Sequence, residues 1–246
     1  MKLEIQALCQ KGIVRSNNED MVSVGGIMLR DSEMAFPVEL NDESQFYLLV
    51  ADGMGGHEHG ERASEELLNY LNDCFKENVF TPENIEDELR SRVKSLSDRL
   101  NQEAEAEGQT RPMGCTLTGV VWMNGRAYLL NAGDSRTYRL RNGILRQLTT
   151  DETPRGITGF PQASKLLLNC IGGGGKGRLT VVEITERLLD GDVLLVCSDG
   201  LTEMVSDEGI ELILNEHAQM AKELYEVACL NGGRDNVSVI VAKLRT

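Results

Sequence analysis

Five aspartates of this 246-residue chain stand next to apolar runs that the sequence predicts as core strands. In an antiparallel sheet, the start of one strand lies beside the end of its neighbour. We therefore expect all five carboxylates to meet at one rim of the fold. Asp52, Asp134 and Asp199 directly follow such runs, at 46–51, 128–133 and 193–198, Asp20 directly precedes the run 21–24, and Asp235 lies two positions before the run 237–241.

Carboxylates that cluster repel one another, and each stays ionised at neutral pH only if positive charge lies between them. Oxygen ligands of this kind select hard cations such as Mg²⁺ or Mn²⁺. Two such ions can share a bridging carboxylate and activate a water for in-line attack on phosphorus. For any single Asp-Gly pair, an ordinary turn at a strand end is the better interpretation. Five such positions, with Arg15 and Glu19 close by, favour a metal-dependent phosphoester hydrolase.

Composition limits the alternatives. A length of 246 residues suits one large domain or two small ones, and 41% hydrophobic residues are typical of a globular chain. The net charge of −14 disfavours nucleic acid as a partner. No apolar run is long enough to span a membrane, and the first residues lack the apolar core of a secretory signal, so we expect a cytoplasmic protein. Six cysteines without a C-x-x-C pair predict reduced, buried thiols.

The elements that must position the aspartates alternate between strands, hairpins and amphipathic helices. Apolar residues at helical spacing predict a helix at about 61–76 and a second that starts near Thr81-Pro82. Asn124-Gly125 and Asn142-Gly143 predict two β-hairpins, because such pairs suit tight turns between strands. Residues 151–178 lack a regular pattern. Further strands are predicted at 3–9, 46–51, 179–184, 192–197 and 237–244, and further helices at about 207–215 and 217–230.

Six short motifs resemble, in order and spacing, those of metal-dependent serine/threonine protein phosphatases of type 2C, in their bacterial form. The resemblance implies an α+β fold, a four-layer α-β-β-α sandwich in which pairs of helices flank two central antiparallel sheets. It implies one such domain over residues 1–246 and hydrolysis of phosphoserine and phosphothreonine by a water or hydroxide that bridges two ions, Mn²⁺ or Mg²⁺. The motifs are Arg15-Ser-Asn-Asn-Glu-Asp20, Val50-Ala-Asp-Gly-Met-Gly-Gly56, Gly114-Cys-Thr116, Ala132-Gly-Asp-Ser-Arg136, Cys197-Ser-Asp-Gly-Leu201 and Arg234-Asp-Asn236.

The resemblance also implies a role for each site residue. Asp52 is expected to bridge both ions, the Gly53 carbonyl to bind one of them, and Asp199 and Asp235 to complete the other. Arg15 is expected to bind the substrate phosphate as a bidentate donor. Glu19 and Asp20 are expected to hold metal-bound waters. Asp134 matches a ligand of a third, weaker ion, whose other aspartate is replaced here by Glu203.

Three positions depart from simple expectations. Met54 occupies the place where the animal form has a histidine proposed as general acid. His57 lies three residues further on, and we interpret it as a solvated loop residue, with a zinc site shared by His57 and His59 still less favoured. The glycine run 172–175 followed by Lys176 does not fit a phosphate-binding loop, because Gly177 follows the lysine.

Two other functions remain open from the sequence. One is a catalytically weak regulator that binds a partner kinase or a phosphoprotein, against which the intact Asp52, Asp199 and Asp235 argue. The other is a two-metal hydrolase of small phosphoesters. For the phosphatase, the expected partners are phosphorylated Ser/Thr proteins, including a cognate Ser/Thr kinase, and the expected state is a monomer without nucleic-acid or membrane partners.

Overall fold

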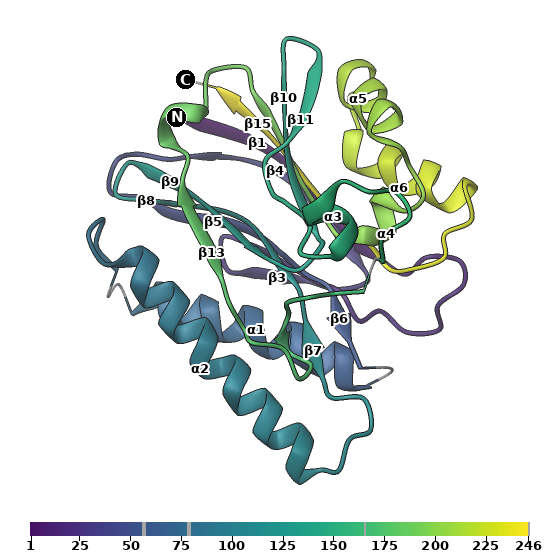
Figure 1. Cartoon of the computed structure of the whole chain (residues 1–246). Helices are drawn as coiled ribbons and strands as arrows, with labels where there is room; N and C mark the ends of the chain where they lie inside the picture. The colour runs from purple at the N-terminus through teal and green to yellow at the C-terminus, as the bar shows by residue number, and fades with distance from the viewer. Residues whose placement is uncertain (56–57, 78–79, 165, 246) are drawn as a thin grey trace.

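Two six-stranded antiparallel sheets lie face to face at the centre of the structure (Figure 1). The computed structural model describes residues 1–55, 58–77, 80–164 and 166–245. Sheet A has the order β11-β10-β14-β15-β1-β4, with β1 at Lys2–Gln10, β4 at Ser32–Glu39, β10 at Arg136–Arg141, β11 at Ile144–Gln147, β14 at Val193–Cys197 and β15 at Val237–Arg245. Sheet B has the order β13-β9-β8-β5-β2-β3, with β2 at Met21–Val24, β3 at Ile27–Leu29, β5 at Gln45–Ala51, β8 at Leu117–Met123, β9 at Arg126–Ala132 and β13 at Thr180–Glu183.

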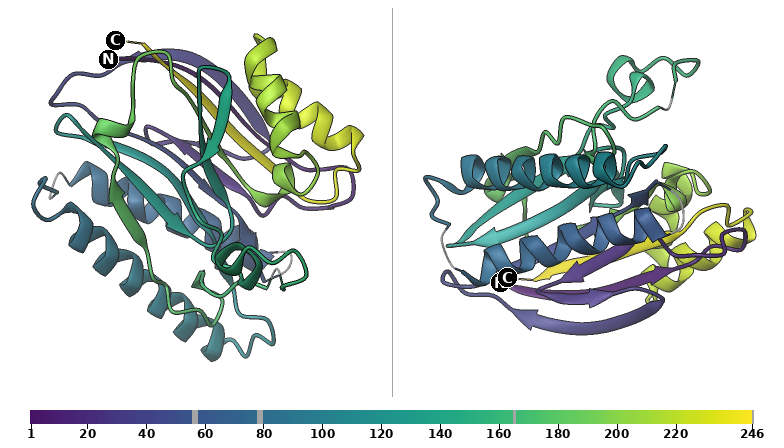
Figure 2. Two further views of the ribbon diagram at one scale, coloured as in Figure 1. Left: turned by 45° about the horizontal axis from the view of Figure 1, so that its top comes forward. Right: turned by 90° about the horizontal axis from the view of Figure 1, so that it is seen from below.

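Helices cover the outer face of each sheet. Figure 1 shows α1 and α2 along one side of the sandwich and α5 and α6 on the other, and Figure 2 shows the two chain ends side by side. The predicted four-layer α-β-β-α architecture is therefore confirmed. The helices are α1 at Glu58–Lys76, α2 at Ile85–Ala106, α3 at Pro154–Thr158, α4 at Asp199–Thr202, α5 at Asp207–Glu216 and α6 at Met220–Leu230, with a 3₁₀ turn at Thr185–Arg187.

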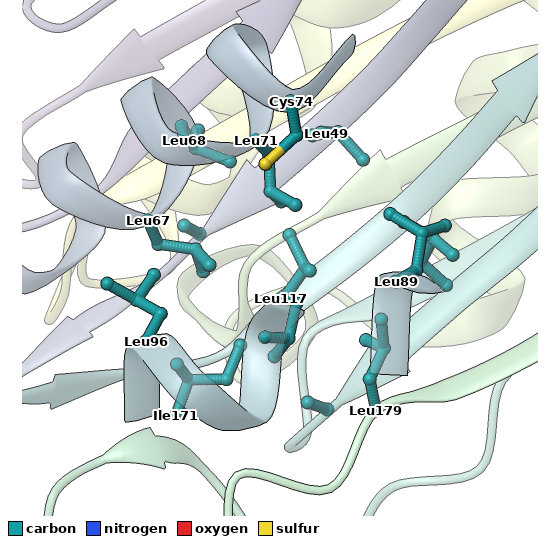
Figure 3. Close-up of a cluster of buried hydrophobic side chains, with 14 of the residues drawn as sticks. Leu49, Leu67, Leu68, Leu71, Cys74, Leu89, Leu96, Leu117, Ile171 and Leu179 are labelled. Carbon is teal, nitrogen blue, oxygen red and sulfur yellow. The ribbon is translucent and has the colours of Figure 1, made fainter. Parts of the chain in front are cut away.

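Three hydrophobic cores fill the three spaces between the four layers. Along β5, Leu48 and Val50 face the core between the two sheets, whereas Leu49 and Ala51 face the helices α1 and α2. This division follows from the strand period of two, because β5 is apolar throughout and is buried on both faces. Figure 3 shows the helix-side core, where leucines of α1 and α2 meet Leu117 of β8. The third core lies between sheet A and the pair α5 and α6.

A small third sheet joins the loops at one end of the sandwich. Its order is β12-β7-β6, with β6 at Gly53–Met54, β7 at Gly114–Cys115 and β12 at Ile171–Gly172. Sequence patterns did not predict it, because two-residue strands show no periodicity. It ties the irregular segment 151–178 to the chain that follows Asp52.

The predicted helices and strands are present, with differences at helix starts: α1 begins about three residues earlier than predicted, and α2 and α6 begin about three to four residues later. Both Asn-Gly hairpins are confirmed, and the asparagine and glycine of each adopt positive φ angles. α2 begins at Ile85 instead of near Thr81, because Thr81 and Asn84 close a turn in which the Asn84 side chain accepts from the Thr81 N–H (2.7 Å). All six cysteines are free thiols, and five of them are buried, as expected. Within the described ranges, no helix combines the length and apolar character that a bilayer span requires.

Candidate metal centre

Strand pairing brings the ends that carry the five aspartates to one rim of the sandwich. In sheet B, Met21 pairs with Ala51, so Asp20 and Asp52 are neighbours across the ladder. In sheet A, Cys197 pairs with both Arg136 and Val239, which places the segments of Asp134, Asp199 and Asp235 together. The rim therefore collects acidic side chains from both sheets, and we call it the acidic rim.

A cleft of about 450 Å³ opens at the acidic rim. It brings together most of the residues that the sequence suggested for the site. Asp20 and Glu203 do not line it: Asp20 is buried at 1% exposure, and Glu203 lines an adjacent hollow of about 180 Å³ with Asp134 and Asp199. The predicted residues that do line the cleft are Arg15, Glu19, Asp52, Gly53, Asp134, Asp199 and Asp235.

Burial, and secondarily repulsion between neighbouring carboxylates, raises the pKa values of Asp20, Asp52 and Asp134 at the acidic rim. Burial raises the pKa of Asp52 well above its usual value, and the nearby carboxylates of Asp20, Asp199, Asp134 and Asp235 raise it further. Burial also raises the pKa of Asp134 to about 7, with Asp199 the next cause. The protein pays an electrostatic cost to assemble these groups, and a cation placed among them would relieve it.

Asp20 lies behind the cleft and links the strands that carry two other aspartates. One of its carboxylate oxygens accepts hydrogen bonds from the hydroxyls of Ser198 (2.8 Å) and Ser238 (2.7 Å). Burial raises the pKa of Asp20 to about 7, although both hydroxyls oppose that rise. Ser198 directly precedes Asp199, and Ser238 lies three residues after Asp235. Asp20 therefore fixes the position of both strands from the side away from the cleft.

Arg15 enters the cleft from the loop after β1. Its Nη2 donates to Oδ2 of Asp235 at 2.6 Å, and this hydrogen bond raises the pKa of the guanidinium. The pair is only partly buried, with 54% and 33% of the two side chains exposed, so it contributes little to stability. Its consequence is positional, because it holds the guanidinium at the edge of the carboxylate cluster.

Backbone packing explains why glycine follows Asp52. A Cβ atom at Gly53 would lie 2.2 Å from the Gly60 carbonyl oxygen and 2.4 Å from that of Glu19. No other residue fits between these two segments. The Asp52 N–H donates to the Thr116 hydroxyl (3.1 Å), and that hydroxyl lies 2.7 Å from the hydroxyl of Ser135. This chain of contacts joins the turns that carry Asp52 and Asp134.

The cleft also contains residues for which sequence reasoning gave no role. Arg111, Leu166 and Leu167 line it, and so does Asn236, whose side-chain oxygen accepts from the Glu19 N–H (2.9 Å). Thr116, Ser135 and Asn236 stand inside the six motifs, which was the available signal. Arg111 and the two leucines stand outside every motif.

The sequence raised the possibility that a histidine near Met54 acts in the site, and the structure describes only one of the two nearby histidines. Met54 lines the cleft, and His57 lies outside the described residues. His59 does not line the cleft, and its Nδ1 lies 3.2 Å from Nε2 of Gln109. Among the residues that the structure describes, no three His, Cys, Asp or Glu side chains converge closely enough to hold one metal ion by themselves.

The fold and the acidic rim define the class of protein. The model of the family described as protein phosphatase 2C matches residues 35–232, and this chain belongs to that family.

Its relatives are bacterial. The chain is 31% identical to the serine/threonine phosphatase stp of Listeria monocytogenes over 250 residues, which cover 95% of this chain and 92% of that protein. It is 33% identical to the serine/threonine protein phosphatase PstP of Mycobacterium tuberculosis over 98% of this chain and 45% of that longer protein.

Solved structures agree with this placement. The serine/threonine phosphatase of S. agalactiae superposes with a TM-score of 0.81 at 25% identity, covering 99% of this chain and 100% of that one. The catalytic domain of PstP, solved in complex with two manganese ions, superposes with a TM-score of 0.76 at 32% identity, covering 99% and 100%.

Proposed function

We propose that this chain is one type 2C domain that hydrolyses phosphoserine and phosphothreonine in proteins, with two divalent ions, Mn²⁺ or Mg²⁺, in the acidic cleft. The observation that carries the proposal is the gathering of partly buried carboxylates, close enough to repel one another, around a cleft that also holds an arginine. Relatives named as serine/threonine phosphatases support the activity, and the two manganese ions in the PstP structure support the cofactor.

The donor set fits such ions. The charged donors of the described cleft lining are carboxylate oxygens, which hard divalent cations prefer. Asp52 would bridge the pair, the Gly53 carbonyl would bind one ion, and Asp199 and Asp235 would bind the other. Glu19 and Asp20 would act through water, in the case of Asp20 from its buried position between two serines. When bound, the ions supply a polarised water as nucleophile and neutralise charge on the phosphoryl oxygens.

The chain's own residues bind and orient the substrate. Arg15 has a planar fork of donors that matches two oxygens of a phosphoryl group. It donates to Asp235 (2.6 Å), a residue that would hold one of the ions, so the guanidinium lies beside the place where the phosphoryl group would bind. Met54 has no ionisable proton, so this position cannot protonate the leaving alkoxide of the substrate side chain.

A third ion would lie in the adjacent hollow, held by Asp134 and Glu203. Arg136 and Arg155 line the same hollow, and Arg136 makes a bidentate ion pair with Asp151 (2.8 and 2.7 Å). Two guanidinium groups already neutralise part of the negative charge there. We therefore expect this site to bind more weakly than the main pair.

The proposed substrates are phosphorylated Ser/Thr proteins, with a Ser/Thr kinase of the same cell among them, and the proposed state is a monomer. Purified protein with Mn²⁺ should release phosphate from a phosphoserine or phosphothreonine peptide, and a chelator should abolish the release. Faster hydrolysis of nucleotides than of phosphopeptides would instead support a small-phosphoester hydrolase. Tight phosphoprotein binding without turnover under any metal would support a regulator.

A further inference from the structure

The cleft has a second guanidinium that the proposed mechanism does not use. Arg111 lines it together with Arg15, and these two are the cations among the described residues of its lining. Arg111 is exposed. Unlike Arg15, it makes no ion pair with any carboxylate that the structure describes. An arginine that is unpaired beside five acidic groups is available to an anionic part of a ligand.

The loop that carries Arg111 is held firmly between α2 and β7. The Gln109 N–H donates to the carbonyl of Ala104 (2.9 Å), and its side-chain oxygen accepts from the N–H of Met113 (2.8 Å). Pro112 restricts the backbone directly after Arg111. This anchoring limits the entropy that the backbone would lose when the arginine binds a ligand.

The ladder between β6 and β7 shows how far Arg111 lies from the proposed ions. Gly53 pairs with Cys115 and Met54 pairs with Gly114, and a Cβ at Gly55 would lie 3.1 Å from the Cα of Met113. Arg111 lies four residues before Cys115, the residue that pairs with Gly53. Four residues of extended backbone span about 13 Å, which is the largest distance along the chain between Arg111 and the level of Gly53. An extended peptide covers the same distance in about four residues. Arg111 is thus placed to meet a residue that flanks the phosphorylated one, whereas Arg15 is placed beside the reacting group.

We propose that Arg111 is a specificity-determining residue that binds an acidic side chain two to four positions from the phosphorylated Ser or Thr. The inference rests on the proposed phosphatase function and narrows its substrate class. In a chain of net charge −14 with an acidic cleft, a carboxylate near the phosphosite meets net repulsion, and of the two guanidinium groups in the described lining of the cleft, that of Arg111 is the one not already paired with a described carboxylate. Arg111 therefore turns a general penalty on acidic substrates into a preference for those whose acidic group is correctly spaced.

The test compares phosphoserine peptides that carry Glu or Gln three positions before or after the phosphoserine, with p-nitrophenyl phosphate as a substrate without a peptide. For one of the two Glu peptides, the wild-type enzyme should have a KM on the order of five-fold lower than for the matching Gln peptide. This ratio corresponds to the upper end of the free energies measured for exposed ion pairs. In Arg111→Gln this preference should disappear, and the loss in kcat/KM should be larger for that peptide than for p-nitrophenyl phosphate. High salt should weaken the wild-type preference.

Arg146→Gln is the matched control, since it removes the same charge from an exposed position on β11, outside the cleft. It should keep the wild-type preference. An unchanged preference in Arg111→Gln, or no preference in the wild type, would overturn the inference. If the wild type hydrolyses no phosphopeptide, the proposed function fails, and fluorescence anisotropy of the same labelled peptides on Mn²⁺-loaded protein still decides the role of Arg111. Equal Kd ratios for the Glu and Gln peptides in wild type and Arg111→Gln would then refute it.

Discussion

The two ends of strand β14 carry aspartates in opposite electrostatic situations. Asp192, just before the strand, is fully buried, and its two carboxylate oxygens accept from Nε (2.6 Å) and Nη2 (2.7 Å) of Arg141. Asp199, just after the strand, lines the cleft at the acidic rim and faces other carboxylates. One end is therefore neutralised within the protein, and the other leaves negative charge for an external cation.

The two opposite rims of the sandwich, the acidic rim and the rim that contains Asp192, differ in the same way. The rim that contains Asp192 also has the two Asn-Gly turns, which close their hairpins with positive φ angles. Asp42 and Asp190 on that rim are exposed to solvent. An aspartate at a strand end is thus a turn residue on one rim and part of the proposed site on the other, and its surroundings make the difference.

The largest effect should come from Asp52→Asn, which removes one charge from the acidic rim while keeping the size of the side chain. We expect phosphatase activity to fall by at least about 100-fold, because an electrostatic group at the reacting centre is lost. The metal-free protein should become more stable, since a neutral amide avoids both the cost of burying a carboxylate and its repulsion by the neighbouring carboxylates, the two causes that raise the pKa of Asp52. Activity assays with Mn²⁺ and melting curves in a chelator measure the two effects.

Asp192→Asn is the matched control at the other end of the sandwich. It should lower stability where Asp52→Asn raises it, because it leaves Arg141 without its charged partner, and it should leave the activity unaffected. We expect the free energy of unfolding to fall by about 1–3 kcal/mol and the activity per folded molecule to stay the same. Normal activity in Asp52→Asn would exclude Asp52 as a ligand, and reduced activity in Asp192→Asn would show that the two rims are not independent.

A smaller effect should appear in the dependence of stability on pH. Burial raises the pKa values of Asp20 and Asp134 to about 7 in the folded protein, against about 3.9 in an unfolded chain. Between these values the folded state binds more protons, so the stability of the metal-free protein should fall as pH rises from about 4 to 7. With Mn²⁺ the melting temperature should rise over the same range, because fewer protons compete for the carboxylates.

Melting curves at pH 5 and pH 8, with chelator and with Mn²⁺, test whether the melting temperature falls with pH in the metal-free protein and rises with pH in the Mn²⁺-bound protein. Asp52→Asn should flatten the fall in chelator, because it removes one source of the repulsion. Greater stability at pH 8 than at pH 5 in chelator would mean that the acidic rim does not control the trend.

Sequence patterns predicted those features that depend on neighbours along the chain. The hairpins at Asn124-Gly125 and Asn142-Gly143, the apolar strand β5 and the stripes of α1 and α2 are local, and each is present. The edge strand β4 escaped prediction because it contains Pro37 and two charged residues and is half exposed along its length. Such an edge strand can be identified only from its pairing with a neighbour, here with β1 over eight positions.

Contacts between distant segments account for what the sequence left unpredicted at the site. Glu19 and Asp20 are adjacent, yet Glu19 lines the cleft and Asp20 is buried behind it. The residues that decide this are Ser198 and Ser238, about 180 and 220 positions away. Ser198 stands inside one of the six motifs and Ser238 stands outside them, but the sequence around neither serine shows that its hydroxyl donates to Asp20. Arg111 was missed for the same reason, because only the ladder between β6 and β7 brings its loop to the cleft.

The smallest effect compares one substitution, serine to alanine, at the two rims. Ser238 is fully buried and donates to Asp20 (2.7 Å), whereas Ser44 lies in an exposed turn where its hydroxyl accepts from the Asn41 N–H (2.9 Å). Ser238→Ala should lower the free energy of unfolding by about 1–3 kcal/mol, since a buried carboxylate loses one of two donors. Ser44→Ala should cost less than about 0.5 kcal/mol, because water replaces the hydroxyl. Loss of the Ser238 donor should also raise the pKa of Asp20 and so weaken Mn²⁺ binding near neutral pH, which calorimetric titration can measure. If the two substitutions lower the free energy of unfolding equally and leave the Mn²⁺ affinity unchanged, Asp20 does not position the segments that carry Asp199 and Asp235.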